Sequence, residues 1–225
     1  MNRIVRRILR KARALGGQAR YDAIFREFKR FTMIGKWRYT ANLELADRFS
    51  SVDGAIVECG TWKGGMIAGM ARLLGRGRSY YLFDSFEGLP EAQAVDGEAA
   101  RRWQADKTSP RYFNNCIAAE QDARTAMELA GAAHSRIEKG WFKDTLPSAE
   151  FPGGIAMLRL DADWYDSTIT ILDHLFKSVN AGGVMIIDDY YTWDGCTRAV
   201  HDFLSKNRCA ERISAHRGVC FIQKT

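Results

Sequence analysis

The chain has 225 residues, 46% of them hydrophobic, which is enough to build one sizeable core. No apolar run approaches the roughly eighteen residues that a bilayer-spanning helix needs, and the basic N-terminus lacks the apolar core of a signal peptide. The five cysteines form no C-x-x-C pair and are odd in number, which argues against a zinc site or a disulfide framework and favours reduced, mostly buried thiols. These features predict a cytoplasmic protein.

Positive charge is concentrated at the N-terminus. Residues 1–38 contain 12 Lys or Arg and 2 Asp or Glu, a net charge of +10, whereas the whole chain carries +6. Apolar residues recur there at helical spacing, which predicts a basic amphipathic helix in an N-terminal extension of residues 1–50, ahead of a main domain of residues 51–225. Such a helix can pack on its own domain or on a partner subunit, or bind an anionic membrane surface or nucleic acid. Packing is the simplest interpretation, and we expect no nucleic-acid partner.

From residue 55 onward, strand-like and helix-like segments alternate. Strands are predicted at 55–59, 79–84, 135–140, 154–161 and 183–189, and helices at 64–75, 123–131, 166–179 and 196–207. A turn is predicted at Gly182-Gly183, and residues 212–223 are expected to form two strands around a tight turn at Arg217-Gly218. The order predicts an α/β, Rossmann-like fold. Its seven-stranded sheet should be mostly parallel and covered on both faces, with an antiparallel hairpin at the C-terminus.

Acidic residues mark the carboxyl ends of the predicted strands. They are Glu58, Asp84, Asp161, Asp188 and Asp189. In an open α/β sheet, ligands bind in the crevice beyond this edge, so we expect the five carboxylates to line one rim of a binding site. Carboxylates this close together repel one another, which costs free energy unless a positive group lies among them.

The first strand leads into a glycine-containing turn, "VECGTWKGG". It lacks the G-x-G-x-x-G fingerprint, which disfavours a nicotinamide or flavin dinucleotide. The pattern Glu58-x-Gly60-x-x-x-Gly64 instead resembles the first motif of class I S-adenosylmethionine (SAM) methyltransferases. Asp84 follows Gly60 at the end of the second strand, where a carboxylate can accept hydrogen bonds from both ribose hydroxyls.

Five segments resemble one family of these enzymes in order and spacing. They are "VECGTWKGG", "LFDSFEGLP", "KGWFKDTLP", "LRLDADWYDST" and "IIDDYYTWDGCTRAV". The family is that of the macrocin O-methyltransferases, which methylate sugar hydroxyls on antibiotics, and the resemblance runs from about residue 53 to residue 207. It implies a class I methyltransferase fold. Residues 1–38, and the segment 91–113 where relatives place a mobile lid over the acceptor, do not resemble the family closely.

The resemblance also implies which residues bind SAM. Glu58, Gly60, Trp62, Lys63, Gly64 and Gly65 would hold the methionine end, and Asp84 would hold the ribose. Ser85 and Phe86 would border the adenosine, Gly140, Trp141 and Phe142 would close over the adenine, and Asp161 would also face the cofactor.

The aspartates of the last two motifs fit metal-assisted chemistry. A sugar hydroxyl is weakly acidic, so its methylation at neutral pH needs a base, a metal or both. Asp161, Asp188 and Asp189 supply three hard oxygen ligands from neighbouring strand ends, which suits Mg²⁺, and the absence of Cys and His argues against zinc. Asp163 is then free to remove the proton, a division of roles that the resemblance supports. His201 is a second candidate base, although a histidine on a helix is more often a surface or packed residue.

These patterns predict a SAM- and Mg²⁺-dependent O-methyltransferase whose partner is a small hydroxyl acceptor, most simply a glycoside from a natural product or a glycan. A catechol-like phenol and a non-catalytic SAM-binding or membrane-associated module are the alternatives, and no residue identifies the acceptor. Aromatic residues near the carboxylates either stack on the acceptor or cap the core: Trp164, Tyr165, Tyr190, Tyr191 and Trp193. Because relatives associate through N-terminal helices, the resemblance also implies a homo-oligomer.

Overall fold

The computed structural model describes residues 3–132 and 135–225, with side chains described from residue 16 onward. Its centre is a seven-stranded sheet with the strand order β3-β2-β1-β4-β5-β7-β6. The strands are β1 (Ala55–Cys59), β2 (Tyr80–Asp84), β3 (Ser135–Lys139), β4 (Ile155–Leu160), β5 (Val179–Ile187), β6 (Ile213–His216) and β7 (Val219–Gln223). The first five run parallel, whereas β7 is antiparallel to β5 and to β6. The predicted mostly parallel sheet with a C-terminal hairpin is confirmed.

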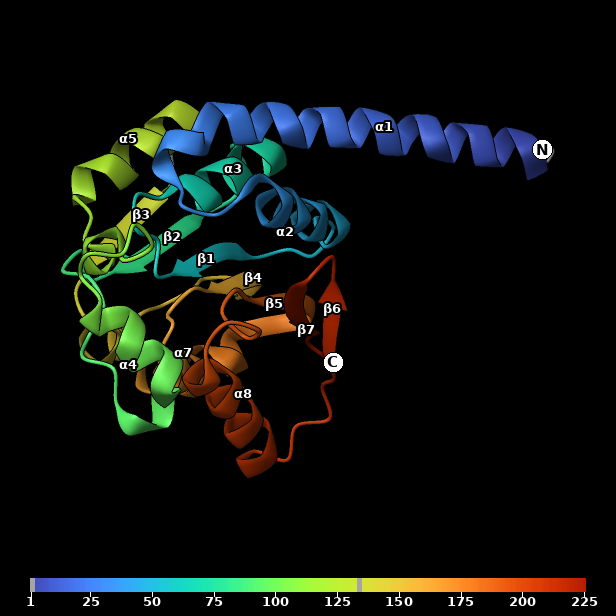
Figure 1. The fold of residues 1–225 in the computed structure, drawn as a ribbon. Helices are drawn as coiled ribbons and strands as arrows, with labels where there is room; N and C mark the ends of the chain where they lie inside the picture. Colours follow the sequence, from blue (N-terminus) through green and yellow to red (C-terminus); the bar gives the residue numbers. More distant parts are fainter. Residues whose placement is uncertain (1–2, 133–134) are drawn as a thin grey trace.

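Helices cover both faces of the sheet (Figure 1). One face carries α1 (Arg3–Phe28), α2 (Lys36–Arg48), α3 (Gly65–Leu74) and α5 (Glu120–Ala130). The other carries α6 (Phe142–Thr145), α7 (Tyr165–Leu175) and α8 (Asp194–Lys206), with α4 (Gly97–Ala105) beside α8. Every residue of β1 and β4 is buried, as expected of central strands between two helical layers.

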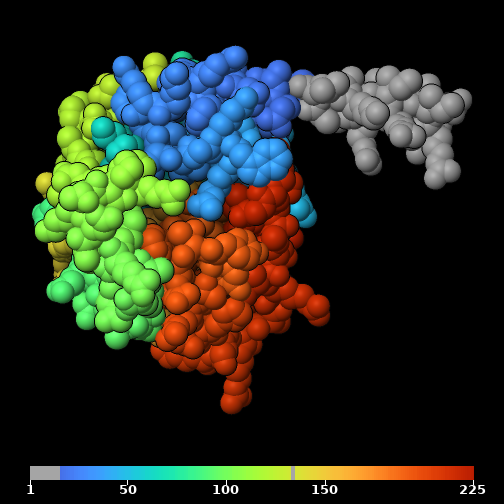
Figure 2. Space-filling view, viewed as in Figure 1, coloured from blue at the N-terminus to red at the C-terminus, as the bar shows by residue number. Residues whose placement is uncertain are grey.

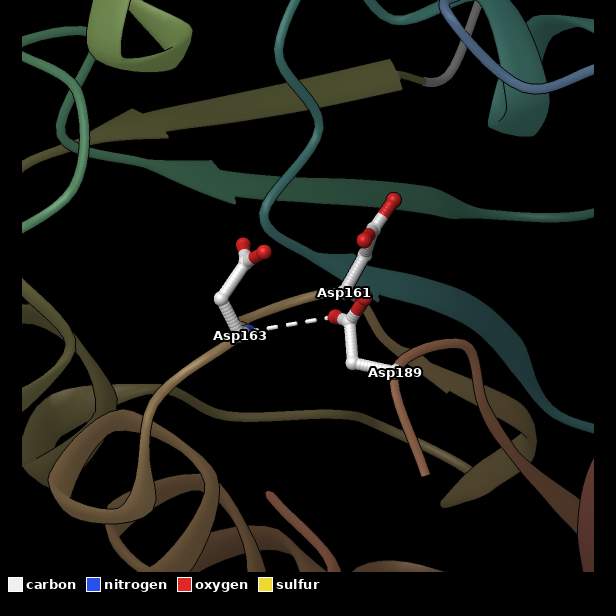
Figure 3. A group of neighbouring side chains, drawn as sticks. All are labelled: Asp161, Asp163 and Asp189. Carbon is white, nitrogen blue, oxygen red and sulfur yellow. Dashed lines mark hydrogen bonds between the residues drawn. The ribbon is translucent and has the colours of Figure 1, made fainter. Parts of the chain in front are cut away.

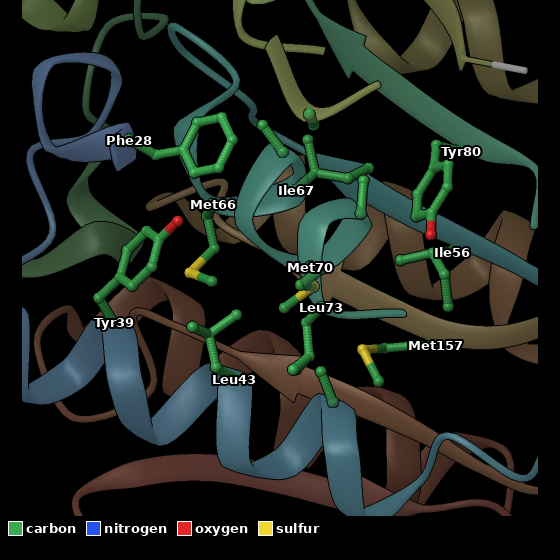
Figure 4. Close-up of a cluster of buried hydrophobic side chains, with 14 of the residues drawn as sticks. Phe28, Tyr39, Leu43, Ile56, Met66, Ile67, Met70, Leu73, Tyr80 and Met157 are labelled. Atoms are coloured by element: carbon green, nitrogen blue, oxygen red, sulfur yellow. The ribbon is translucent and has the colours of Figure 1, made fainter. Parts of the chain in front are cut away.

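The N-terminal segments pack on the main body through α3 (Figure 4). Tyr21, Ile24 and Phe28 on α1 are buried, and the Tyr39 hydroxyl of α2 donates a hydrogen bond of 2.8 Å to the Gly65 carbonyl. Gly65 also lets the backbone of Phe31 lie against the start of α3, because a Cβ there would lie 2.5 Å from the carbonyl oxygen of Phe31. None of the helices among the described residues is long and apolar enough to cross a membrane.

One predicted turn is wrong. Gly182 and Gly183 do not separate a helix from a strand but lie inside β5, which begins at Val179. The pairing of β4 with β5 shifts register here, since Ile155 faces Val179 while Met157 faces Val184. A side chain on Gly183 would meet backbone oxygens at 2.8 and 2.9 Å, so the glycines permit this irregularity in the strand. The helix predicted at 166–179 accordingly ends at Leu175, followed by a 3₁₀ turn over Phe176–Ser178.

Candidate active site

A cavity of about 610 Å³ opens beyond the carboxyl ends of the central strands. Its walls come from the glycine turn after β1, the loops after β2 and β3, and the aspartates after β4 and β5. Two further walls are residues 31–38 and part of the segment between α4 and α5. In Figure 2 the blue N-terminal part, the green part and the orange part of the chain meet around this hollow. The predicted rim of the sheet is therefore a real cavity.

The glycine turn is held against the loop after β4. Gly60 has a φ of +84°, and a Cβ on it would lie 1.7 Å from the carbonyl oxygen of Asp161. Gly64 has a φ of +75° and caps the start of α3. Both positions need the freedom that glycine alone has, and the first brings the cofactor turn into contact with the aspartate loop.

Asp84 lies where a ribose-binding carboxylate is expected, and it also organises the loops around it. Its two oxygens accept hydrogen bonds of 2.7 Å from the backbone N–H groups of Trp62 and Phe86. Burial raises the pKa of Asp84, and these backbone donors oppose that shift. Asp84 thereby joins the turn after β1 to the loop after β2.

Most of the residues predicted to bind the cofactor line the cavity. They are Glu58, Gly60, Trp62, Gly65, Asp84, Ser85, Gly140, Trp141, Phe142 and Asp161. The indole N–H of Trp62 and the hydroxyl of Thr61 are buried without a hydrogen-bond partner in the described part of the chain, which leaves polar groups for a bound molecule. The cavity therefore fits SAM in its chemistry.

Three predicted cofactor residues do not line the cavity. Lys63 lies 3.7 Å from the carboxylate of Asp122 and 4.8 Å from the centroid of the Trp62 ring. Gly64 serves the turn into α3, and the side chain of Phe86 is buried in the core, so only its N–H reaches Asp84. Gly64 and Phe86 thus contribute to the site through their backbone, and Lys63 contacts the neighbouring residues Trp62 and Asp122.

Arg159 is the functional residue that sequence reasoning missed. It is buried in β4 opposite Glu58 in β1, and its Nη1 donates hydrogen bonds of 2.7 Å to Glu58 and 2.8 Å to Asp161. Its Nη2 lies 2.6 Å from an oxygen of Asp188, and its Nε donates to the side chain of Asn42 at 3.1 Å. Arginine stays protonated even when buried, so Arg159 supplies part of the positive charge that the crowded carboxylates require. The sequence feature that could have revealed this role is that Arg159 is the one charged residue in the otherwise apolar strand β4.

Three aspartates gather at the cavity (Figure 3). Carboxylate oxygens of Asp161, Asp163 and Asp189 all lie within 4.8 Å of one another. The backbone N–H of Asp163 donates to Asp189 at 3.1 Å, and the indole N–H of Trp193 donates to Oδ1 of Asp163 at 2.9 Å. Burial, reinforced by the charge of Asp161, raises the pKa of Asp163 to about 8. Burial raises the pKa values of Asp161 and Asp189 as well.

The remaining candidates lie elsewhere. Asp188 lines the cavity beside this group but faces two arginines, Arg159 and, at 3.6 Å, Arg38. The compact group thus contains Asp163 in place of Asp188, unlike the predicted set of ligands. His201 does not line the cavity: it is exposed on α8, with its Nε2 2.8 Å from the hydroxyl of Tyr190.

The aspartate group fits a hard divalent cation. Its donors are carboxylate oxygens, which Mg²⁺ prefers, and no histidine or cysteine among the described residues shares the group. A cation among the three would also relieve the repulsion that contributes to their raised pKa values.

Residues 3–222 match the family described as macrocin O-methyltransferase (TylF). The chain belongs to the macrocin O-methyltransferase family. Among curated proteins, it is 36% identical over 196 residues to 8-demethyl-8-(2,3-dimethoxy-alpha-L-rhamnosyl)-tetracenomycin-C 4'-O-methyltransferase of Streptomyces olivaceus, covering 81% of this chain and 71% of that protein. It is 34% identical over 184 residues to demethyldecarbamoylnovobiocin O-methyltransferase of Streptomyces niveus, covering 78% and 68%.

Solved structures agree with this assignment. The O-methyltransferase NovP superposes with a TM-score of 0.71 at 30% identity, over 87% of this chain and 82% of that chain. The calicheamicin methyltransferase CalS11 shares the fold, with a TM-score of 0.61 at 18% identity over 80% and 76%. This macrocin O-methyltransferase family member is therefore a SAM-dependent O-methyltransferase, as the sequence motifs indicated, and the non-catalytic alternative is set aside.

Proposed function

We propose that the enzyme methylates a hydroxyl of a sugar, on a natural product or a glycan, with the help of Mg²⁺. The observation that carries this proposal is the contact between two loops: the cofactor turn at Gly60 touches the backbone of Asp161, at the edge of the aspartate group. A methyl donor and an activated hydroxyl would thus lie side by side. The relatives named above support a sugar, because one methylates a rhamnosyl group according to its name.

Each side chain has a role in this proposal. Asp84 and the glycine turn would hold SAM. Asp161 and Asp189, which belong to the compact aspartate group, would hold Mg²⁺, with Asp188 beside them as the third predicted ligand. Bound Mg²⁺ would lower the pKa of the acceptor hydroxyl and orient it. Asp163 is assigned as the base because Trp193 fixes one of its oxygens, while the other oxygen has no hydrogen bond within the described residues. A lone pair of the hydroxyl oxygen then forms the new C–O bond, the C–S bond breaks with its electrons returning to sulfur, and Asp163 takes the proton.

A screen with radiolabelled SAM tests the proposal. Simple glycosides are compared with catechols, each in the presence of Mg²⁺ and of EDTA, and Asp189→Ala serves as the site-deficient variant. We expect label transfer to glycosides that needs Mg²⁺ and is lost in the variant. Transfer to catechols alone would move the function to the phenol alternative, and undiminished transfer in EDTA would remove the metal from the proposal.

Two proposals concern the surroundings of the enzyme. Residues 1–38 carry a net charge of +10, which supports peripheral contact with an anionic membrane surface in the cytoplasm. The N-terminal helices are also proposed to mediate a homo-oligomer. Sedimentation with anionic and with neutral vesicles tests the first proposal, and light scattering tests the second. Recovery of the protein in the supernatant with both kinds of vesicle would contradict membrane contact, and a monomeric mass would contradict assembly.

A further inference from the structure

The cavity has two chemically different ends. At its floor the carboxylates of Asp188 and Asp189 are buried, whereas the cations that line it, Lys36, Arg38 and Arg111, lie on the two outer walls. Lys36 is engaged, because its Nζ lies 2.8 Å from a carboxylate oxygen of Asp22. Positive charge available at the mouth therefore comes from the two arginines.

Neither arginine side chain donates a hydrogen bond to another described residue. The side chain of Arg38 is 40% exposed, and its nearest carboxylate oxygen, on Asp188, lies 3.6 Å away, beyond hydrogen-bond distance. The side chain of Arg111 is exposed and has no ion pair within the described residues. The backbone of Arg111 is nevertheless fixed, since the indole N–H of Trp103 donates to its carbonyl at 2.8 Å. Each wall thus presents a guanidinium with unused donors.

Each arginine lies close in sequence to an exposed aromatic ring that lines the same cavity. Trp37 is 66% exposed and Phe113 is 47% exposed. Trp37 is held in place, because the guanidinium of Arg217 stacks on its ring with Cζ 3.8 Å from the centroid, and Glu44 in turn binds Arg217. Trp37 remains 66% exposed in spite of this contact, and Phe113 is exposed as well, so an exposed ring and a guanidinium with unused donors on each wall point to a ligand.

We propose that the acceptor is a sugar nucleotide, in which the hydroxyl-bearing sugar is joined to a nucleoside diphosphate. The geometry assigns the diphosphate to Arg38 and Arg111, because guanidinium groups match phosphate oxygens, and the base to the rings of Trp37 and Phe113. This proposal rests on the proposed sugar methylation and narrows the acceptor from sugars in general to sugar nucleotides. It also orders the reactions: the methyl group is added while the sugar is still activated, before a glycosyltransferase consumes it.

Calorimetric titration of the full chain with UDP, dTDP and GDP tests this subsite directly. The protein is first saturated with S-adenosylhomocysteine, and EDTA is present so that no metal bridges the phosphates. At least one nucleoside diphosphate should bind, and the Arg38→Gln/Arg111→Gln double variant should lower its affinity by about tenfold or more. Trp37→Ala should weaken binding of the nucleotide but not of inorganic pyrophosphate. Arg101→Gln is the matched control, because Arg101 pairs with Glu98 on α4 and does not line the cavity.

Binding of S-adenosylhomocysteine separates the possible failures. If it binds normally while no nucleoside diphosphate does, or if the double variant binds the nucleotide like the unaltered protein, the subsite proposal is wrong. Methyl transfer to a neutral glycoside that excess nucleoside diphosphate does not inhibit would also overturn it and would leave the proposed sugar methylation standing. If S-adenosylhomocysteine itself fails to bind the folded protein, the proposed function fails as well.

Discussion

Asp163 combines a fixed orientation with an environment that favours holding a proton. Trp193 holds one of its oxygens, and burial raises its pKa to about 8. We expect Asp163→Asn, which has nearly the same size but cannot accept the proton, to lower kcat by roughly 10² to 10⁴. Calorimetry should show that the variant still binds SAM and Mn²⁺. Turnover close to that of the unaltered enzyme would place the base elsewhere, and loss of Mn²⁺ binding would make Asp163 a ligand.

Asp84 should matter for the cofactor in two ways, by contacting the ribose and by holding two backbone N–H groups. Removing its carboxylate in Asp84→Ala should lower the SAM affinity about tenfold or more, since a hydrogen bond to a charged group contributes about 1.5 to 3 kcal/mol. The control is Asp122→Ala, which removes the carboxylate facing Lys63. Unchanged SAM affinity in a folded Asp84→Ala protein would contradict the assigned site.

At the level of elements, α1 divides into two parts with different expected importance. Tyr21, Ile24 and Phe28 of α1 are buried in the core, and the cavity wall begins at Phe31. Deleting residues 1–14 should therefore leave turnover of a soluble acceptor within about a few-fold, because these buried residues and the cavity wall are all retained. Deleting residues 1–38 should abolish activity.

Both truncations are compared by a methyl-transfer assay and by thermal unfolding. Complete loss of activity in a folded protein lacking residues 1–14 would show that this part of the helix helps to build the active site. It could do so by reaching the active site of a neighbouring subunit.

Elements and site residues differed in how well the sequence predicted them. The central strands were predictable because a strand buried on both faces is a continuous apolar run that ends at polar residues, as in β1 and β4. The role of Arg159 could not be predicted from the sequence, because its partners Asn42 and Glu58 lie 117 and 101 residues away in the chain. Residues 31–38 were missed for the same reason, since only the packing of α1 and α2 on α3 brings them to the cavity.

For the whole molecule, the carboxylates predict how stability depends on pH. The folded-state pKa of Asp163 is raised from 3.8 to about 8, and those of Asp161 and Asp189 are raised too. A raised pKa means that the folded state binds the proton more tightly. The resulting stabilisation is complete below about pH 4 and is lost as the pH rises through about 8. In EDTA, the melting temperature should therefore fall between about pH 5 and about pH 8.5.

Melting curves with and without Mg²⁺ check this expectation. Added Mg²⁺ should reduce the fall by favouring the ionised carboxylates, and Asp163→Asn, which does not titrate, should reduce it in EDTA. A melting temperature that stays level or rises over this range in EDTA would contradict the raised pKa values.

The position of β1 between β2 and β4 has a consequence for how the chain folds. Ala55 pairs with Ile155, so one side of β1 has no strand partner until about a hundred more residues have been synthesised. A nascent chain that has emerged only as far as β3 holds the cofactor turn, but β1 is then an open edge with exposed N–H and C=O groups. Pairing across such a long stretch of chain is slow to form. We therefore expect the unfinished polypeptide to depend on chaperones, and to aggregate if translation stalls before residue 155.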